Sequence, residues 1–148
     1  MARVKLSEYR AKSLLTPGYQ GISLRLDSLD DDIEKLAADQ QYIIKVDQGI
    51  KKRGKQGLVR LNVSAENVRS AIEELAAKGF SRFIAEPMVA HDDNEERYVC
   101  FERFRDGIHI LYSEHGGVSV EDSPESVKSY QQADVPLPAE FVGHMIEV

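Results

Sequence analysis

A basic segment punctuated by glycines, residues 45–57, limits the fold of this 148-residue chain more than any other feature. It reads KVDQGIKKRGKQG and lies between two apolar runs, 42–44 and 58–63. Both runs are typical of strands, so the segment is predicted to be a loop that a sheet anchors at each end. Glycines let backbone amides approach phosphate oxygens closely, and lysine and arginine attract them. The loop therefore indicates a phosphate-binding site.

The loop stands out because the chain as a whole is acidic, with a net charge of -6 at pH 7. That charge argues against a general binder of nucleic acids or anionic membranes. A hydrophobic content of 42% is sufficient for a core, and the length suggests one domain or two small lobes. The single cysteine, Cys100, has no internal partner, and no apolar run approaches the roughly 20 residues that cross a bilayer. We therefore expect a cytoplasmic protein.

Three stretches begin with a capping serine and continue with apolar residues at helical spacing, which predicts helices. The stretches are 7–15, 28–37 and 64–78. Pro17 ends the first because proline cannot continue the hydrogen-bond ladder, and Gly79 ends the third.

Strands are predicted where β-branched, aromatic or alternating residues run together. These runs are 21–26, 42–45, 58–63, 80–85, 97–104 and 108–113. Asp106 and Gly107 form a hairpin signal between the last two runs. Pro87 withdraws an amide after the fourth run, so 86–89 predicts a hinge. Residues 21–80 thus predict a compact α/β lobe with two amphipathic helices on one small sheet.

The C-terminal residues 141–146 place four apolar side chains at helical spacing. The sequence stops about three turns into this predicted helix, without a C-cap signal. An apolar-faced helix needs a surface to cover it. We therefore expect that the chain was cut from a longer polypeptide and that an exposed apolar edge could support a homo-oligomer.

Four segments carry a family resemblance. They read LSEYRAKSLL at 6–15, IIKVDQGIKKRGKQGLV at 43–59, FIAEPMVAHDDNEERYVC at 83–100 and HGGVSVED at 115–122. Together they resemble the nucleotide-binding part of the ATP-grasp acyl-CoA ligases, a group that comprises ATP-citrate lyase, citryl-CoA synthetase and the beta subunit of succinyl-CoA synthetase. The resemblance is closest to ATP-citrate lyase, and the two middle segments are the most specific.

The resemblance implies a fold in which ATP lies between two antiparallel sheets. The chain would be a partial ATP-grasp-like domain of the α/β (α+β) class over residues 1–148. Residues 18–84 would form the smaller α/β lobe. Residues 1–17 and 85–148 would begin the larger, antiparallel-sheet lobe.

Three residues match the family positions that contact the ATP phosphates. Lys45 resembles the strand lysine that reaches the phosphates, a role suited to a long side chain with three donors. Arg53 and Gly54 resemble the loop that closes on the nucleotide. The resemblance thus implies that strand and loop hold the phosphates together.

Three further residues match the positions that contact the nucleoside. Pro87 and Val89 resemble hinge residues, so the Pro87 carbonyl would accept from the adenine edge and the Val89 amide would donate to it. Glu96 resembles the carboxylate that accepts hydrogen bonds from the ribose hydroxyls. ATP is therefore the cofactor that the resemblance implies.

Two departures from the family pattern limit these implications. The family carries a glutamate directly before the Gly-Gly of its EGGV motif, whereas here His115 precedes Gly116 and Gly117. The acidic role is not transferred to Glu114 by shifting the register. The family's metal-holding strand, Glu-Ile-Asn-Pro, does not occur before Val148, so no magnesium ligand is assigned here although Mg²⁺ is expected in the parent enzyme.

The resemblance implies an ATP-binding fragment of an ATP-grasp acyl-CoA ligase, whose parent would activate citrate or succinate as a CoA ester. The isolated chain is expected to be inactive because the metal, CoA and acid sites are missing. Its expected partners are nucleotide and the remaining ligase domains or a partner subunit. The alternative is a non-catalytic nucleotide-binding or regulatory module that a partner chain completes.

Simpler interpretations stay open for single residues. Residues 51–55 could be a solvated charge run or, as a third function, a contact to nucleic acid. Lys45 could be a charged residue that protects a sheet edge. Glu96 could be solvated within its acidic loop.

Overall fold

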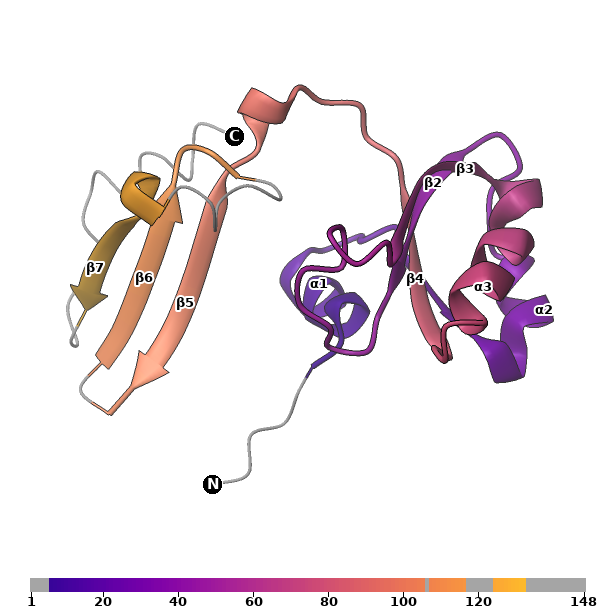
Figure 1. Ribbon diagram of the computed structural model, residues 1–148, viewed down its shortest axis with the longest axis horizontal. Helices are drawn as coiled ribbons and strands as arrows, with labels where there is room; N and C mark the ends of the chain where they lie inside the picture. Colours follow the sequence, from indigo (N-terminus) through magenta and orange to yellow (C-terminus); the bar gives the residue numbers. More distant parts are fainter. Residues whose placement is uncertain (1–5, 106, 117–123, 133–148) are drawn as a thin grey trace. The chain divides into compact units, whose positions relative to one another are not determined.

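The computed structural model describes residues 6–105, 107–116 and 124–132. The chain divides into two compact units, Met1–Ala90 and His91–Val148 (Figure 1). Each unit contains its own antiparallel sheet, and helices accompany the first, so the predicted α+β class is confirmed. The predicted lobe boundaries, after residues 17 and 84, stay predictions.

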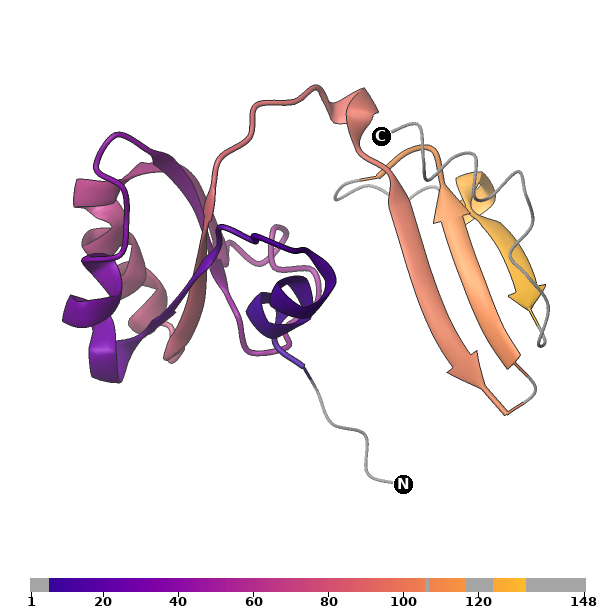
Figure 2. The same ribbon diagram turned by 180° about the vertical axis from the view of Figure 1, so that it is seen from behind.

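The first unit is built on a four-stranded sheet in the order β1-β4-β2-β3, with all neighbours antiparallel. Its strands are β1 (Ile22–Arg25), β2 (Gln41–Val46), β3 (Val59–Ser64) and β4 (Arg82–Pro87). Helices α2 (Leu29–Ile33) and α3 (Val68–Ala76) lie on one side of the sheet, and α1 (Glu8–Leu15) lies on the other (Figures 1 and 2).

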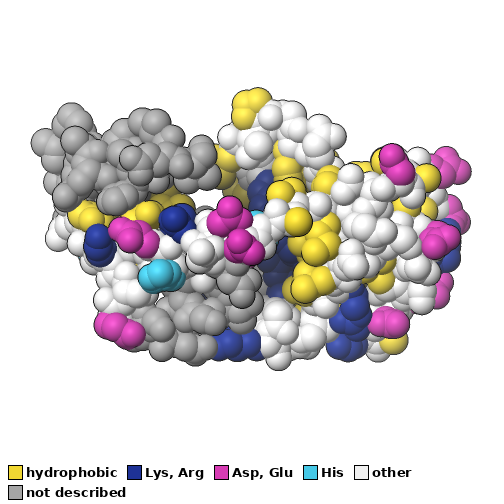
Figure 3. All heavy atoms as spheres, turned by 90° about the horizontal axis from the view of Figure 1, so that it is seen from above, with side chains coloured by type: hydrophobic (Ala, Val, Ile, Leu, Met, Phe, Trp, Pro, Cys, Tyr) yellow, Lys and Arg dark blue, Asp and Glu magenta, His cyan; other side chains and the backbone are white. Residues whose placement is uncertain are grey.

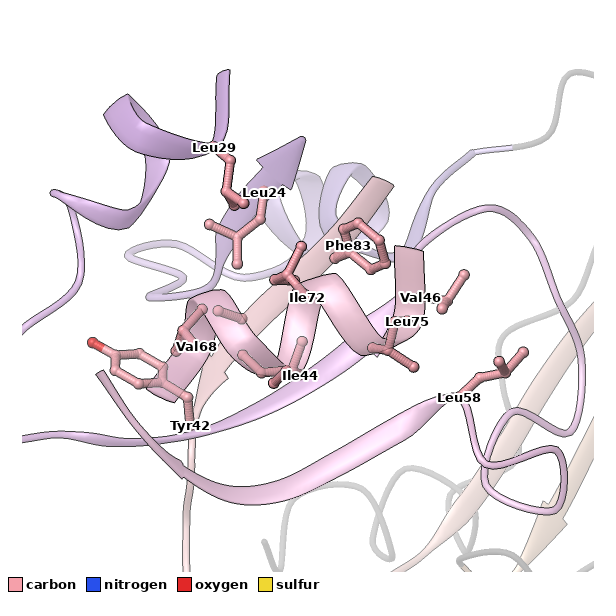
Figure 4. Packing of buried hydrophobic residues seen from close by; sticks show 12 residues of the cluster. Leu24, Leu29, Tyr42, Ile44, Val46, Leu58, Val68, Ile72, Leu75 and Phe83 are labelled. Carbon is pink, nitrogen blue, oxygen red and sulfur yellow. The ribbon is translucent and has the colours of Figure 1, made fainter. Parts of the chain in front are cut away.

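The core of the first unit lies between the sheet and the helices α2 and α3 (Figure 4). Its fully buried side chains come from both layers, and among them are Leu24, Ile44, Ile72, Leu75 and Phe83. The helical members recur at the spacing of one helix face, as the sequence predicts. Burial of such side chains stabilises the fold by roughly 1.5–3 kcal/mol each.

The alternation of strand residues decides what projects to the side of α1. Ile44 and Val46 of β2 are buried in the core, so Lys45 between them points to the other face. Ala85 of β4 is also in the core, so Glu86 points to the same face as Lys45. The sheet thereby places a cation and a carboxylate on the face that α1 covers.

The predicted serine caps differ in outcome. Ser7 caps α1 as predicted, because its Oγ accepts from the Arg10 amide at 3.3 Å. Ser28 makes no such bond: its hydroxyl donates to Asp32 Oδ2 at 2.8 Å, and α2 ends at Ile33, four residues before the predicted end. The prediction for this helix was too long because the chain leaves the α-helical pattern after Ile33: the Lys35 and Leu36 amides donate to carbonyls three residues earlier.

Other boundaries shift by one to four residues. A 3₁₀ turn (Ala65–Asn67) follows Ser64 and precedes α3, and Gly79 adopts a φ of 93° after the helix ends, as the predicted stop requires. Strand β2 continues through Val46, so the basic loop begins at Asp47 and Lys45 belongs to the strand.

The second unit contains a three-stranded antiparallel sheet in the order β5-β6-β7. Its elements are a 3₁₀ turn (Asp93–Glu95), β5 (Tyr98–Phe104), β6 (Gly107–Ser113), a second 3₁₀ turn (Pro124–Ser126) and β7 (Lys128–Gln132). Phe104 pairs with Gly107, so the hairpin is confirmed with a two-residue connection. Strand β7 was not predicted, and the predicted helix at 141–146 lies outside the described residues.

Candidate functional site

Three cations and two carboxylates meet on the α1 side of the first sheet. The Lys45 ammonium lies 2.7 Å from Glu86 Oε2 and 3.4 Å from Glu8 Oε1. Arg53 Nη2 contacts the other Glu8 oxygen. The Lys12 ammonium lies 2.7 Å from Glu8 Oε1 and 2.6 Å from Glu86 Oε1. We call these five residues the charge cluster.

The basic loop holds Arg53 in the cluster. Arg53 Nη1 donates to the Val46 carbonyl at 2.7 Å, and the Arg53 carbonyl accepts from the Leu58 amide at 2.9 Å. The Gly57 amide donates to the Gly54 carbonyl at 3.1 Å, and Gly57 takes a left-handed φ of 62° that glycine adopts freely. The loop is thus folded by its own hydrogen bonds and aims Arg53 back at the end of β2.

Asp47, the first residue of the loop, anchors α1. Its carboxylate accepts from the Glu8 amide at 2.6 Å and from the Tyr9 amide at 3.1 Å. These amides belong to the first turn, which has no partners within the helix. Asp47 is only 6% exposed, so a buried carboxylate fixes the helix start and delivers the Glu8 side chain to the cations.

Tyr19 completes the surroundings of Glu86. Its hydroxyl donates to Glu86 Oε1 at 2.6 Å, and its ring lies 6.1 Å from that of Tyr9 between centroids. A Cβ at Gly21 would lie 2.3 Å from the Tyr19 ring, so only glycine leaves room for this placement. Glu86 therefore accepts hydrogen bonds from a phenol and from two lysines.

The cluster keeps its carboxylates ionised. Burial alone would raise the pKa of Glu8, but the hydrogen bond from Lys12 and the charges of Lys45 and Arg53 outweigh it and lower the pKa to about 2. For Glu86, burial is likewise outweighed by its hydrogen bonds, and its pKa is lowered. Both carboxylates of the cluster therefore carry a negative charge at neutral pH.

The two residues predicted to form the hinge, Pro87 and Val89, lie one and three positions after Glu86. Pro87 is the last residue of β4 and pairs with Tyr42, so the strand runs through the proline. The Met88 amide donates to the Gln41 carbonyl at 2.8 Å. Val89 is 70% exposed. The predicted adenine contacts of Pro87 and Val89 stay predictions.

Glu96 belongs to the second unit, whereas the charge cluster belongs to the first. Its Oε1 lies 3.0 Å from His91 Nε2, and its carbonyl accepts from the Gly116 amide at 2.9 Å. A Cβ at Gly116 would lie 2.8 Å from the backbone of Glu96 and Arg97. Gly116 therefore packs against the backbone that carries Glu96, and the ribose role of Glu96 stays a prediction.

Sequence reasoning assigned Lys45 and Arg53 and missed their partners. Glu8 and Lys12 stand four residues apart in the first helix, a spacing that signals an ion pair. Asp47 and Glu86 lie in the segments that carry the family resemblance, but the sequence indicated no role for either residue. Strand alternation could have placed Glu86 beside Lys45, but no local signal indicates that α1 covers that face.

Two features are absent from the described part of the chain. It holds no cluster of three or more His, Cys, Asp or Glu side chains that could bind a metal ion. None of its helices is long and apolar enough to cross a membrane. Acidic side chains gather on the end of the first unit that α2 and α3 form (Figure 3).

Comparison with curated proteins finds relatives of one kind, although no protein-family model matches the chain. ATP-citrate synthase of Mus musculus is 41% identical over 92 residues, which are 56% of this chain and 8% of that protein. ATP-citrate synthase alpha chain protein 2 of Arabidopsis thaliana is 31% identical over 151 residues, which cover 87% of this chain and 35% of that protein. This chain is a relative of the ATP-citrate lyases.

A solved structure supports the same relationship at the level of the fold. ATP citrate lyase from Methanothrix soehngenii, determined in complex with citrate and coenzyme A, superposes with a TM-score of 0.67 at 22% identity. The match covers 96% of this chain and 43% of that one. The predicted resemblance to ATP-citrate lyase is therefore confirmed, and the chain spans less than half the length of each of these proteins.

Proposed function

We propose that this chain forms the phosphate-holding part of an ATP site in an acid–CoA ligase of the ATP-citrate lyase type. One observation carries the proposal: Lys45 and Arg53, from different elements, both reach the carboxylate of Glu8. A carboxylate and a phosphate present similar oxygen acceptors to such donors. Two cations that converge on one anionic group can converge on another.

The individual roles follow the family resemblance. Lys45 and Arg53 would bind phosphate oxygens, and the turn at Gly54 would bring backbone amides close to them. The Pro87 carbonyl and the Val89 amide would bind adenine, and Glu96 would accept from the ribose. Support for the phosphate roles is structural, whereas support for the nucleoside roles is the resemblance alone.

Magnesium would accompany ATP in the parent enzyme, because metal ions bridge the terminal phosphates in phosphoryl transfer. The described residues offer no ligand cluster for it. On the family resemblance, we assign this chain a share in nucleotide binding in the cytoplasm, and we assign turnover to the complete parent enzyme. The name of the plant relative, an alpha chain, supports completion of the site by a partner subunit.

Nucleotide titration tests the proposal. Addition of ATP should shift the amide signals of Lys45 and of the loop around Arg53 in a saturable way. Lys45→Ala and Arg53→Ala should each weaken binding roughly tenfold, the value of one charge-assisted contact of about 1.5 kcal/mol. Arg69→Ala is the matched control, because Arg69 pairs with Asp30 away from the cluster. Unchanged spectra at millimolar ATP would contradict the proposal.

The alternative, a non-catalytic module completed by a partner chain, shares this binding step. It differs in what happens on reconstitution. If the remaining ligase segments restore acyl-CoA formation when mixed with this chain, the ligase role holds. Binding without restored turnover would favour the regulatory module.

A further inference from the structure

We propose that Glu8 is an internal counter-anion, which occupies the position of a phosphate between Lys45 and Arg53 and must be displaced when a polyphosphate binds. The proposal rests on the phosphate role given above to these two cations. It adds a residue that sets the affinity of the site. It also gives α1 a role in the site, because this helix carries Glu8.

The geometry shows that Glu8 occupies the donors that a phosphate would need. One carboxylate oxygen contacts Lys45 and the other contacts Arg53. The second terminal nitrogen of Arg53 is already held by the Val46 carbonyl. Glu8, Lys45 and Arg53 are each about a fifth exposed, at 21%, 21% and 22%, so a ligand can reach them from solvent.

Glu86, the second carboxylate of the cluster, is not suited to exchange. It sits on β4, an inner strand of the sheet, and accepts from Tyr19 as well as from Lys12 and Lys45. Displacing its carboxylate would break three hydrogen bonds at once. Glu86 therefore fixes Lys45 in place, and Glu8 is the exchangeable partner.

Helix α1 buries little apolar surface of its own, although Ile84 of β4, which pairs with Lys45 and points to the same face, is fully buried. None of the α1 residues is buried, and Leu14 and Leu15 are 69% and 81% exposed. The helix is joined to the sheet side by hydrogen bonds to Asp47 and by ion pairs of Lys12 with Glu86 and of Glu8 with Lys45 and Arg53. Lys12 remains four residues from Glu8 on the same helix, so Glu8 keeps one cation after it leaves Arg53.

A charge-matched pair of variants tests the proposal. Glu8→Gln removes the competing charge and should tighten binding of both ATP and inorganic tripolyphosphate several-fold in calorimetry. Glu73→Gln, on the exposed surface of α3, removes the same charge away from the cluster and should leave both affinities unchanged. Unchanged or weaker binding by Glu8→Gln, with the thermal unfolding temperature retained, overturns the proposal.

A measurement on the unmodified chain guards against misfolding of the variant. Carboxyl carbon NMR should show the pKa of Glu8, about 2 without ligand, rise toward its ordinary value of 4.5 when ATP saturates the site. A pKa that stays near 2 in the saturated protein overturns the proposal.

The same data separate this inference from the proposed function. If ATP binds through Lys45 and Arg53 but Glu8→Gln does not change its affinity, the counter-anion role of Glu8 is wrong and the proposed nucleotide site is supported. If Glu8→Gln tightens tripolyphosphate binding and ATP binds no better than tripolyphosphate, the counter-anion stands and the nucleotide site fails.

Discussion

The two faces of the first sheet are held by different forces. On one face, α3 buries Val68, Ile72 and Leu75 completely against the strands. On the other face, α1 buries no residue and is attached through ionic and hydrogen-bonded contacts. The apolar face therefore maintains the fold. The polar face presents a set of charges that can exchange partners, which is what an anion site requires.

The largest expected effect is on the apolar face. Ile72→Ala should lower the free energy of unfolding by about 2–5 kcal/mol, because a fully buried side chain leaves a cavity. Leu14→Ala on α1 is the control and should change stability by less than about 0.5 kcal/mol, since Leu14 is exposed. Chemical denaturation measures both. Equal losses would show that α1 is as well packed as α3.

Acid should detach the polar face before it unfolds the apolar one. The pKa values of Glu8 and Glu86 are lowered in the folded state, so their contribution to stability is present above their ordinary value of 4.5 and is lost at lower pH. For Glu8 the loss continues down to the folded-state pKa of about 2. Amide exchange between pH 5 and pH 2 should therefore rise in α1 while α3 stays protected. Simultaneous loss of protection in both helices would show that the faces are not independent.

Asp47→Asn should have an intermediate effect, confined to the same helix. The amide keeps one acceptor oxygen and turns a donor toward an α1 N–H, so docking of α1 should weaken by about 1–2 kcal/mol. Hydrogen exchange of the first-turn amides measures the change. Asp39→Asn, at an exposed position with the same charge change, is the control. A similar loss in both variants would indicate a general charge effect.

The contrast between the faces also explains what the sequence could reveal. Periodicity and capping are local, so the apolar spacing of α3, the Ser7 cap and the stop at Gly79 were predictable. The ion pairs are not local: Glu8 and Lys45 are 37 residues apart, and Lys12 and Glu86 are 74 apart. Only the docking of α1 onto a particular face brings them together.

Two local errors have physical causes as well. Helix α2 was predicted too long because the Lys35 and Leu36 amides donate to carbonyls three residues earlier, which does not continue the α-helix beyond Ile33. Strand β7 reads KSYQQ and has no apolar alternation, so pairing with β6 creates it and its own composition does not. The Lys45 and Arg53 assignments came from the family resemblance, and composition alone would not have distinguished them from a solvated charge run.

The smallest expected effect comes from Tyr19→Phe, which tests whether the Glu86 carboxylate stays in place without its hydrogen bond from Tyr19. Tyr19→Phe removes one hydrogen bond to Glu86 and leaves the ring, so stability should fall by about 0.5–1.5 kcal/mol. Because Lys12 and Lys45 still hold the carboxylate, phosphate affinity should change by less than about threefold. Tyr9→Phe is the control, since it changes the neighbouring ring without touching Glu86. A larger loss of affinity in Tyr19→Phe than in Lys45→Ala would mean that the hydroxyl, and not the sheet, holds the polar face in place.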